Sequence, residues 1–423
     1  MRLKRTSTKK RIVLLAFVLI TLASGLYFAR KSGTDPDAYS NDFNVYYHAA
    51  REVIGGRDPY QHSLGDWTPY IYPPLLAEII VPLAFLPLPV AAYVWFVVGA
   101  GSIVAAAWIS ARLATDSEGT FVLEQSASAL ASRRAAIAVC AAIVVLRFVL
   151  DTFNLGQVNA LVLVLAVAHV HLYARDRKAL SAVALVIAVS IKLTPALLLL
   201  YHLAKLRLRF VALCVALLVA VTAISLLPFG HHGAEVLQTF WNRTVKNEQG
   251  YDFGYSGNQS LRGAIARLTG ETNEAHPDGR EPNRPDDPTT LLVSMVLLAI
   301  AAFAAVRART ELAAAAPLFC CMVLLSPLSW KAHYVILIPP VAYLISRAKV
   351  LKRGGLLIAS TLVAAFTLFN LTSPRVIGLA AAEWADYHAL VFVGALIIFI
   401  ACAASTLAGP NERNLRKQTS EPG

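Results

Sequence analysis

Long apolar stretches recur along the chain and restrict its fold more than any other feature. They lie at 12–29, 135–151, 157–174, 210–229, 290–307, 311–327, 333–346, 355–372 and 387–408. A helix of about 20 apolar residues spans the hydrocarbon core of a bilayer. With 57% hydrophobic residues, only 15% charged residues and a mean hydropathy of +0.57, the chain is too apolar for an ordinary soluble protein. The sequence therefore predicts an all-α polytopic membrane protein.

Lys and Arg residues gather in short segments between the apolar stretches, and these segments predict the orientation. The formal net charge is +12, which in a soluble protein would suggest a nucleic-acid partner. Here the cations follow the positive-inside pattern of cytoplasmic loops, so we expect a lipid bilayer and no nucleic acid as partner. A basic segment at 1–11 precedes the first stretch, and no A-x-A cleavage site follows closely. We therefore expect a retained first span and a cytoplasmic N-terminus.

Two regions do not fit one span each. The stretch 73–112 is too long for one crossing and is interrupted by three prolines. The stretch 179–204 lies between two basic clusters, so it is expected to enter and return as a hairpin of two short helices with Lys192 at its tip. Counting 73–112 as one broken crossing gives about twelve spans with both termini inside. Counting it as two would put every later basic cluster outside, so one crossing is preferred.

The first long polar segment predicts a helix outside the spans. Apolar residues from Asp42 to residue 54 follow a spacing of three and four, which is typical of an amphipathic helix. Asn41 or Asp42 would cap it, and Gly55-Gly56 would end it. We expect this helix to lie flat at the membrane surface. The predicted organisation is one integral membrane domain over 1–423, with external loops at 30–72 and 230–289 and a cytoplasmic tail at 409–423.

The predicted topology gathers ionisable and polar residues on the external side, and such residues at membrane depth are costly and usually functional. Lys192 stands beside Pro195 at a helix break, where its ammonium can hold an anionic group such as phosphate. Alternatively, Lys192 pairs with Asp151 or extends to the interface. Arg147 and Asp151 are four residues apart and can form a simple ion pair on one helix.

Other polar residues on this side have a structural interpretation beside the functional one. Asp42 can be a helix cap, and Gln157 and Asn159 can join helices through hydrogen bonds. His333 can sit at the membrane interface, and Asn258-Gln259 can be ordinary loop polarity. The sequence has no metal-ligand spacing, no phosphate-binding glycine loop and no nucleophile elbow, which argues against the nucleotide chemistry of soluble enzymes.

Seven short segments occur along the chain in a characteristic order. They are DFNVYYHAA (42–50), GGRDPY (55–60), YPPL (72–75), GQVNALVLVLA (156–166), IKLTP (191–195), GNQS (257–260) and SPLSWKAHY (326–334). Together they resemble glycosyltransferase family 87, polytopic mannosyltransferases of the GT-C superfamily. The resemblance implies a GT-C-type bundle in a bacterial inner membrane, with the active site on the external or periplasmic face. It also implies a polyprenyl-phosphate sugar as donor and a glycolipid or glycan as acceptor, as in the members that extend phosphatidylinositol mannosides.

The resemblance also implies roles for individual residues. The family's early acidic residue, its catalytic base, corresponds to Asp42, and the lysine of its K-x-x-P motif corresponds to Lys192. Its GQ-x-N residues correspond to Gln157 and Asn159. After SP-x-SW the family has two adjacent histidines, whereas this chain keeps only the second, in Lys331-Ala332-His333. The residues predicted to bind donor phosphate and substrate are Lys192, His333, Lys331, Gln157, Asn159, Tyr46, Asn258 and Gln259.

The chemistry of this transfer suits one carboxylate. A base takes the proton of the acceptor hydroxyl, while the departing phosphate already carries its charge and needs no proton donor. Fixed positive charge stabilises the leaving group and the oxocarbenium-like transition state. We therefore expect inversion, no metal and no cofactor. A transporter or flippase for a lipid-linked sugar and a non-catalytic scaffold stay as alternatives; the transporter would show polar residues on both faces and repeat symmetry, and no internal repeat is evident.

Overall fold

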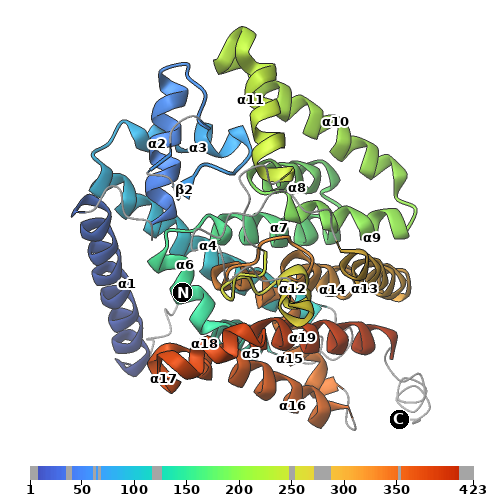
Figure 1. Ribbon diagram of the computed structural model, residues 1–423. Helices are drawn as coiled ribbons and strands as arrows, with labels where there is room; N and C mark the ends of the chain where they lie inside the picture. Colours follow the sequence, from blue (N-terminus) through green and yellow to red (C-terminus); the bar gives the residue numbers. More distant parts are fainter. Residues whose placement is uncertain are drawn as a thin grey trace, which may run out of the picture.

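The computed structural model describes residues 8–34, 41–60, 63–64, 68–116, 126–246, 253–270, 287–350 and 354–408. These ranges are almost entirely helical, apart from a short antiparallel ladder between β1 (Ser63–Leu64) and β2 (Thr68–Pro69). Five of the described helices, α4, α5, α10, α13 and α19, are long and apolar enough to cross a membrane, and several shorter helices are also apolar. The protein is therefore an all-α, multi-pass membrane protein (Figure 1).

The first group of helices extends from Thr8 to Thr269. It comprises α1 (Thr8–Thr34), α2 (Asp42–Ile54), α3 (Pro74–Ala84), α4 (Leu88–Asp116), α5 (Ala127–Val144), α6 (Leu146–Asn154), α7 (Asn159–Ala174), α8 (Lys178–Ile191), η2 (Thr194–Leu198), α9 (Leu199–Ala204), α10 (Leu208–Ser225), η3 (Leu227–His232), α11 (Gly233–Phe240), η4 (Trp241–Val245) and α12 (Leu261–Thr269).

The second half contains the most deeply buried helices. It comprises α13 (Pro288–Arg307), α14 (Glu311–Leu324), η5 (Lys331–Leu337), α15 (Ile338–Val350), α16 (Gly355–Phe366), η6 (Thr367–Leu371), α17 (Pro374–Ile377), α18 (Leu379–Tyr387) and α19 (Leu390–Leu407). The predicted tail at 409–423 lies outside the described residues, as do 247–252 and 271–286 of the predicted loop at 230–289 and part of the loop at 30–72.

The long stretch 73–112 divides into two helices where its prolines predicted a break. The short helix α3 ends at Ala84, and the 29-residue helix α4 begins at Leu88, just after Pro87. Proline disfavours helical backbone at the residue before it and cannot donate a backbone hydrogen bond within a helix. The stretch therefore consists of a short helical piece followed by one long helix.

The stretch 179–204 folds as the predicted hairpin. Helix α8 ends at Ile191, and Lys192 has extended backbone angles of φ −152° and ψ 132°. Ser181, near the start of α8, and His202, near the end of α9, both contact the ring of His169 on α7, at 2.9 and 3.3 Å. Because the start of α8 and the end of α9 meet at one residue, the chain reverses direction at the break. Lys192 therefore lies at the tip of the hairpin.

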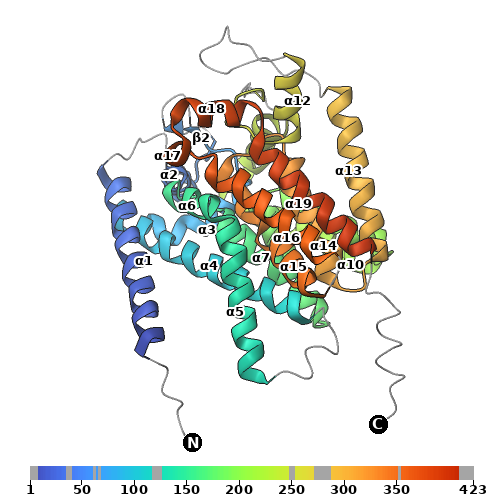
Figure 2. The same cartoon turned by 90° about the horizontal axis from the view of Figure 1, so that it is seen from below.

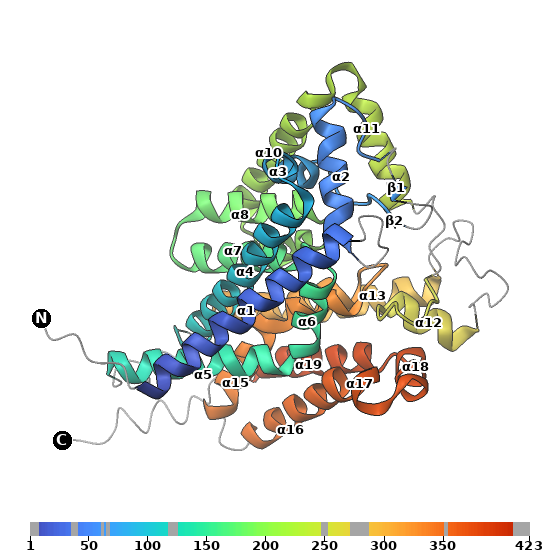
Figure 3. The same cartoon turned by 90° about the vertical axis from the view of Figure 1, so that its left-hand side faces the viewer.

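The predicted amphipathic helix is α2, and its capping follows the sequence. The side chain of Asn41 accepts a hydrogen bond from the Phe43 backbone N–H, and the helix ends at Gly55. Its aromatic face is buried: the rings of Phe43 and Tyr46 lie 5.6 and 6.1 Å from that of Trp95 on α4. Figure 3 shows α2 lying crosswise to α7 and α8.

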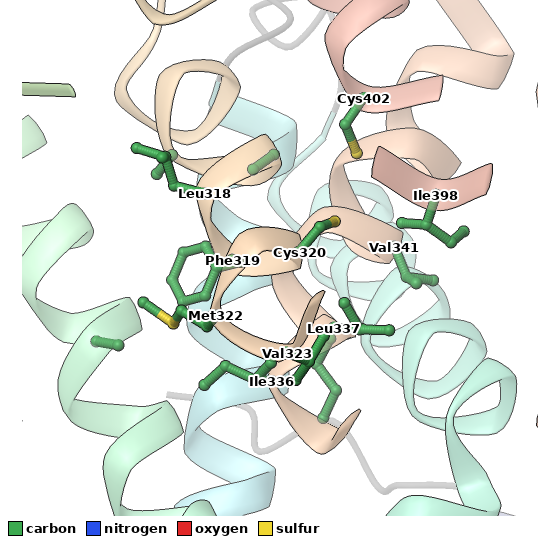
Figure 4. Close-up of a cluster of buried hydrophobic side chains, with 14 of the residues drawn as sticks. Leu318, Phe319, Cys320, Met322, Val323, Ile336, Leu337, Val341, Ile398 and Cys402 are labelled. Carbon is green, nitrogen blue, oxygen red and sulfur yellow. The ribbon is translucent and has the colours of Figure 1, made fainter. Parts of the chain in front are cut away.

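The hydrophobic core has two parts. In the larger part, α14 is buried on every side from Leu312 to Leu324, which marks it as a central helix. Figure 4 shows Val323 of α14 next to Ile336 and Leu337, and Cys320 on the side of the helix that faces Val341 and Ile398. The smaller part joins α2, α3 and α4 through residues such as Tyr46, Leu76 and Trp95.

The two ends of the bundle carry different elements. In two perpendicular views, α12, α17 and α18 lie at one end, whereas the starts of α1 and α5 lie at the opposite end (Figures 2 and 3). The turn between α7 and α8 also lies at the end opposite to α12 and α18 (Figure 3).

Candidate active site

A cavity of about 860 Å³ opens among α2, the end of α6, the hairpin tip and the start of η5. Its wall brings together six of the predicted site residues from four separate parts of the sequence: Asp42, Tyr46, Gln157, Lys192, Lys331 and His333. Apolar side chains including Val45, Leu155, Leu193 and Phe240 line it as well. A concave, partly apolar pocket with a few converging polar groups is the usual form of a small-molecule site.

Three of these polar side chains form one hydrogen-bonded chain together with Asn159. Gln157 Nε2 donates to Asp42 Oδ2, and Asn159 Nδ2 donates to Gln157 Oε1 at 2.9 Å. Lys192 Nζ then donates to Asn159 Oδ1 at 2.9 Å. The chain runs from a carboxylate to an ammonium through two buried amides, and each amide both accepts and donates. Lys192 thus bonds to Asn159, and the alternative pairing with Asp151 is not what the structure shows.

Local backbone structure fixes the carboxylate end of this chain. Asn41 caps α2, so Asp42 takes the first helical position. The Asp42 backbone N–H donates to Leu155 O at 2.8 Å, which joins the start of α2 to the end of α6. Gly156 follows with φ +63°, and a Cβ there would lie 2.7 Å from Phe28 and 2.9 Å from Phe43. Only glycine fits this turn, which presents Gln157 to Asp42.

The environment of Asp42 makes its carboxyl group a weak acid. Burial raises the pKa of Asp42 from 3.8 to about 7, because the charged form loses its water. The positive charge of Lys192 acts in the opposite direction and lowers that pKa. A carboxyl group that titrates near neutral pH can take up a proton during a reaction and release it afterwards.

Lys331 and His333 lie close in sequence but have different surroundings. His333 shares a smaller adjoining pocket with Asn159, Lys192 and Thr194. Lys331 Nζ pairs with Asp386 Oδ2 on α18 and is absent from the lining of that smaller pocket. In a 3₁₀ helix, which has three residues per turn, side chains two positions apart point in different directions. His333 therefore faces the Lys192 side of the cavity, and Lys331 faces away from it.

Two tyrosines stand beside the carboxylate. The hydroxyl groups of Tyr46 and Tyr72 are hydrogen-bonded at 3.1 Å, and both residues line the cavity. Tyr46 belongs to the predicted site, whereas Tyr72 was noticed only as part of the YPP segment. Its position directly before two prolines, at the start of α3, was the available signal.

Asn258 and Gln259 are outside the lining of the large cavity. Asn258 Nδ2 donates to the backbone oxygens of Phe253 and Pro327, both at 2.9 Å, and its Oδ1 accepts from the Ser329 N–H at 2.9 Å. Gln259 Nε2 donates to Asp386 O at 2.8 Å. The contacts of Asn258 attach the GNQS segment to the backbone just before Lys331, and the contact of Gln259 attaches it to α18. The two amides therefore lie behind the cavity wall.

Sequence reasoning missed several charged residues of the wall. Asp151 lines the same cavity as Asp42, and Arg243, Lys246 and Arg262 line it too. Asp151 was interpreted only as an ion-pair partner, of Arg147 or of Lys192, and the charges of Asp151 and Arg147 are 4.0 Å apart. A better signal was its place at the start of DTFNLGQVN, six residues before Gln157.

Within the described ranges, no three His, Cys, Asp or Glu side chains lie close enough together to hold an ion. Asp151 nevertheless supplies a second carboxylate to the cavity, which the sequence did not indicate. Independence from metal stays a prediction.

Comparison with known proteins gives consistent matches. The model of glycosyltransferase family 87 matches residues 70–328. A polyprenol-phosphate-mannose-dependent alpha-(1-2)-phosphatidylinositol pentamannoside mannosyltransferase of Mycobacterium tuberculosis is 27% identical over 413 residues, 95% of this chain and 89% of the relative. Its counterpart in Mycolicibacterium smegmatis is 28% identical, over 87% of this chain and 86% of the relative. A phosphatidylinositol mannoside mannosyltransferase of that species is 29% identical, over 76% and 73%.

Proposed function

The chain belongs to glycosyltransferase family 87, and on this premise we propose that it transfers mannose from a polyprenyl-phosphate donor to a hydroxyl group of a glycolipid acceptor. The acceptor class is that of the relatives, phosphatidylinositol mannosides. The observation that carries the proposal is the hydrogen-bonded chain from Asp42 to Lys192 in one cavity. It holds a carboxylate and an ammonium, the proposed base and the proposed phosphate ligand, at a fixed separation.

In the proposed reaction, Asp42 is the general base. A carboxylate oxygen of Asp42 takes the proton from the acceptor hydroxyl as that oxygen attacks C1 of the donor sugar. The bond between C1 and the phosphate oxygen breaks on the opposite face, so the configuration at C1 inverts. Polyprenyl phosphate leaves with the electron pair and already carries its charge, so no acid is needed. The Asp42 pKa of about 7 lets the base return its proton to water afterwards.

Lys192 and His333 are the proposed ligands of the donor phosphate. They share the smaller pocket beside Asn159, and fixed cations or hydrogen-bond donors stabilise charge that builds up on a leaving group. The amide groups of Gln157 and Asn159 orient both charged residues before substrate arrives. Tyr46 lies one helical turn after Asp42 on α2 and donates its hydroxyl hydrogen to the Tyr72 hydroxyl, which it orients at the cavity wall. The polyprenyl chain would leave along the apolar part of the wall, which includes Leu193.

The proposed membrane arrangement has about twelve spans, with α2 as an interfacial helix and the cavity on the external or periplasmic face of a bacterial inner membrane. Each predicted span overlaps one of α1, α4, α5, α7, α8, α9, α10, α13, α14, α15, α16 and α19. The crosswise position of α2 relative to α7 and α8 supports an interfacial place (Figure 3). Labelling of single cysteines at Asp58 and Arg375 from outside intact cells tests this. Labelling of only one of the two positions would contradict the arrangement.

Transfer in proteoliposomes tests the function. We expect radiolabelled mannose to pass from polyprenyl-phosphate mannose to phosphatidylinositol mannosides, and neither GDP-mannose nor polyprenyl-phosphate glucose to replace this donor. The outcome that contradicts the proposal is movement of the donor across the bilayer without any glycosylated product, because that is the behaviour of a flippase.

A further inference from the structure

Asp151 holds a carboxylate in the cavity that the proposed reaction does not use. Its side chain is 36% exposed and lines the cavity. The Arg147 guanidinium is only at the limit of an ion pair, 4.0 Å away, because it donates to Thr372 Oγ1 at 3.2 Å and to Phe369 O at 3.4 Å. The carboxylate of Asp151 therefore keeps oxygen atoms directed at the open volume.

Lys331 stands beside Asp151 on the same wall. The Thr152 hydroxyl donates to Ala332 O at 3.1 Å, so the residues next to Asp151 and Lys331 in the chain are in direct contact. Lys331 is itself fixed by its ion pair with Asp386. Trp330 also lines the cavity, and its ring lies 5.7 Å from that of Tyr255 in an edge-on arrangement.

The charged groups on this wall differ from those on the side of the cavity that is proposed to bind phosphate. A phosphate group is attracted to Lys192 and His333, whereas a second carboxylate repels it. The wall formed by Asp151, Lys331 and Trp330 instead offers hydrogen-bond acceptors, donors and a flat apolar ring. This combination suits a neutral ligand with several neighbouring hydroxyl groups.

Backbone contacts bring this wall close to the proposed base. Leu155, whose carbonyl oxygen accepts from the Asp42 N–H, is four residues after Asp151. One turn of α6 therefore separates the two attachment points, about 6 Å along the helix. That separation is comparable to the breadth of a sugar ring, so one hydroxyl of a ring can reach Asp42 while others reach Asp151.

We propose that Asp151, Lys331 and Trp330 form the subsite for the acceptor sugar, a neutral hexopyranose, and thereby select the hydroxyl group that Asp42 deprotonates. The inference rests on the proposed function and extends it. Lys331, which the sequence analysis expected to bind donor phosphate or substrate, serves the acceptor in this arrangement.

The test compares Asp151→Asn and Lys331→Gln with the wild type in steady-state transfer. Hydrogen bonds to charged groups contribute enough that each change should raise the acceptor KM about ten- to hundredfold. The donor KM should change less than twofold. The linkage of the product, determined by NMR, should become mixed in Asp151→Asn. A rise in donor KM with an unchanged acceptor KM would overturn the subsite.

Two further measurements separate this role from a structural one. Arg147→Met removes the ion-pair partner and should lower the melting temperature without raising the acceptor KM; an equal rise in both variants would mean that Asp151 only holds α6. Asp176→Asn is the matched control, because Asp176 is 85% exposed in the turn between α7 and α8.

A binding readout that needs no catalysis keeps the subsite apart from the proposed function. Acceptor glycolipid alone should raise the melting temperature of the wild type and of Trp330→Phe, but not of Asp151→Asn. Equal stabilisation of the wild type and Asp151→Asn overturns the subsite even if no transfer is detected. Transfer that fails with every donor while acceptor binding still depends on Asp151 refutes only the proposed reaction.

Discussion

The bundle of α7, α8 and α9 carries a cluster of polar side chains at each end, and only one of the two clusters borders the large cavity. The cavity cluster consists of Asp42, Gln157, Asn159, Lys192 and His333. The closed cluster, at the other end of the same helices, consists of His169, Ser181, Tyr201, His202, Arg207 and Glu311. No member of the closed cluster lines the large cavity, whereas Asp42, Gln157, Lys192 and His333 do.

In the closed cluster the groups satisfy one another. Arg207 Nη1 and Nη2 donate to the two carboxylate oxygens of Glu311, both at 2.7 Å, and its guanidinium lies 4.5 Å from the Tyr173 ring centre. His169 contacts Ser181 at 2.9 Å and His202 at 3.3 Å. Such a network stabilises the junction of several helices and leaves little capacity for a ligand.

In the cavity cluster the hydrogen-bonded chain ends on a carboxylate and an ammonium that face open space. Burial of polar groups in a membrane protein is therefore a weak sign of function by itself. The informative feature is a buried charge that also borders a cavity. A transporter or flippase would need accessible polar groups at both ends, and the closure of the second cluster supports the enzyme.

The substitution expected to lower the transfer rate most is that of Asp42. Asp42→Asn keeps the size and the hydrogen bond to Gln157 but removes the base, so transfer should fall about 10²- to 10⁴-fold. The measurement is initial rate per folded protein, with folding checked by the melting temperature in detergent. Asp176→Asn, the exposed control, should transfer like the wild type. Retained activity in Asp42→Asn would leave Asp42 with only a structural role at the start of α2.

The sequence predicted the parts of the site that depend on local pattern. The proline at 195 beside Lys192 indicated a helix break, and the spacing of apolar residues after Asp42 indicated an amphipathic helix; α2, η2 and the hairpin agree. The resemblance then placed Asp42, Gln157, Asn159 and Lys192 in one site, and the structure brings these four side chains together.

Other features depended on tertiary contacts that no local pattern encodes. Asp151 shares the cavity because α6 meets both the start of α2 and the segment before η5. Asn258 and Gln259 lie behind the wall because their amides donate to backbone oxygens far along the chain. The partner of Asn258 is Pro327, and the partner of Gln259 is Asp386. The closed cluster likewise joins His169 to His202 and Arg207 to Glu311, pairs that sequence spacing does not reveal.

Lys192→Met should give the next largest effect, because it removes the proposed phosphate ligand while keeping most of the side-chain volume. Loss of one group that stabilises transition-state charge typically lowers the rate 10²- to 10³-fold. We expect most of the loss in kcat and in the donor KM, with the acceptor KM little changed. A loss confined to the acceptor KM would contradict a role for Lys192 at the phosphate.

The pH dependence of the transfer rate tests whether Asp42 is the base. Asp42 must be deprotonated to act as base, and its pKa is about 7 instead of 3.8, so kcat/KM should fall as pH decreases through about 7. Lys192 lowers this pKa, so the midpoint should move to higher pH in Lys192→Met. A profile that stays flat between pH 5 and pH 8, apart from enzyme unfolding, would be inconsistent with Asp42 as the titrating base.

The closed cluster should give the smallest effect on transfer. Glu311→Gln leaves the Arg207 guanidinium without its carboxylate, and an unpaired buried charged group costs about 1–3 kcal/mol of stability. The melting temperature should therefore fall, whereas the transfer rate per folded molecule should stay within about twofold of the wild type, since the cluster does not border the cavity. Asp42→Asn should show the opposite pattern, with lost transfer and little change in melting temperature. If Glu311→Gln instead lowers transfer without lowering the melting temperature, the two ends are coupled during turnover, and the closed cluster takes part in the reaction cycle.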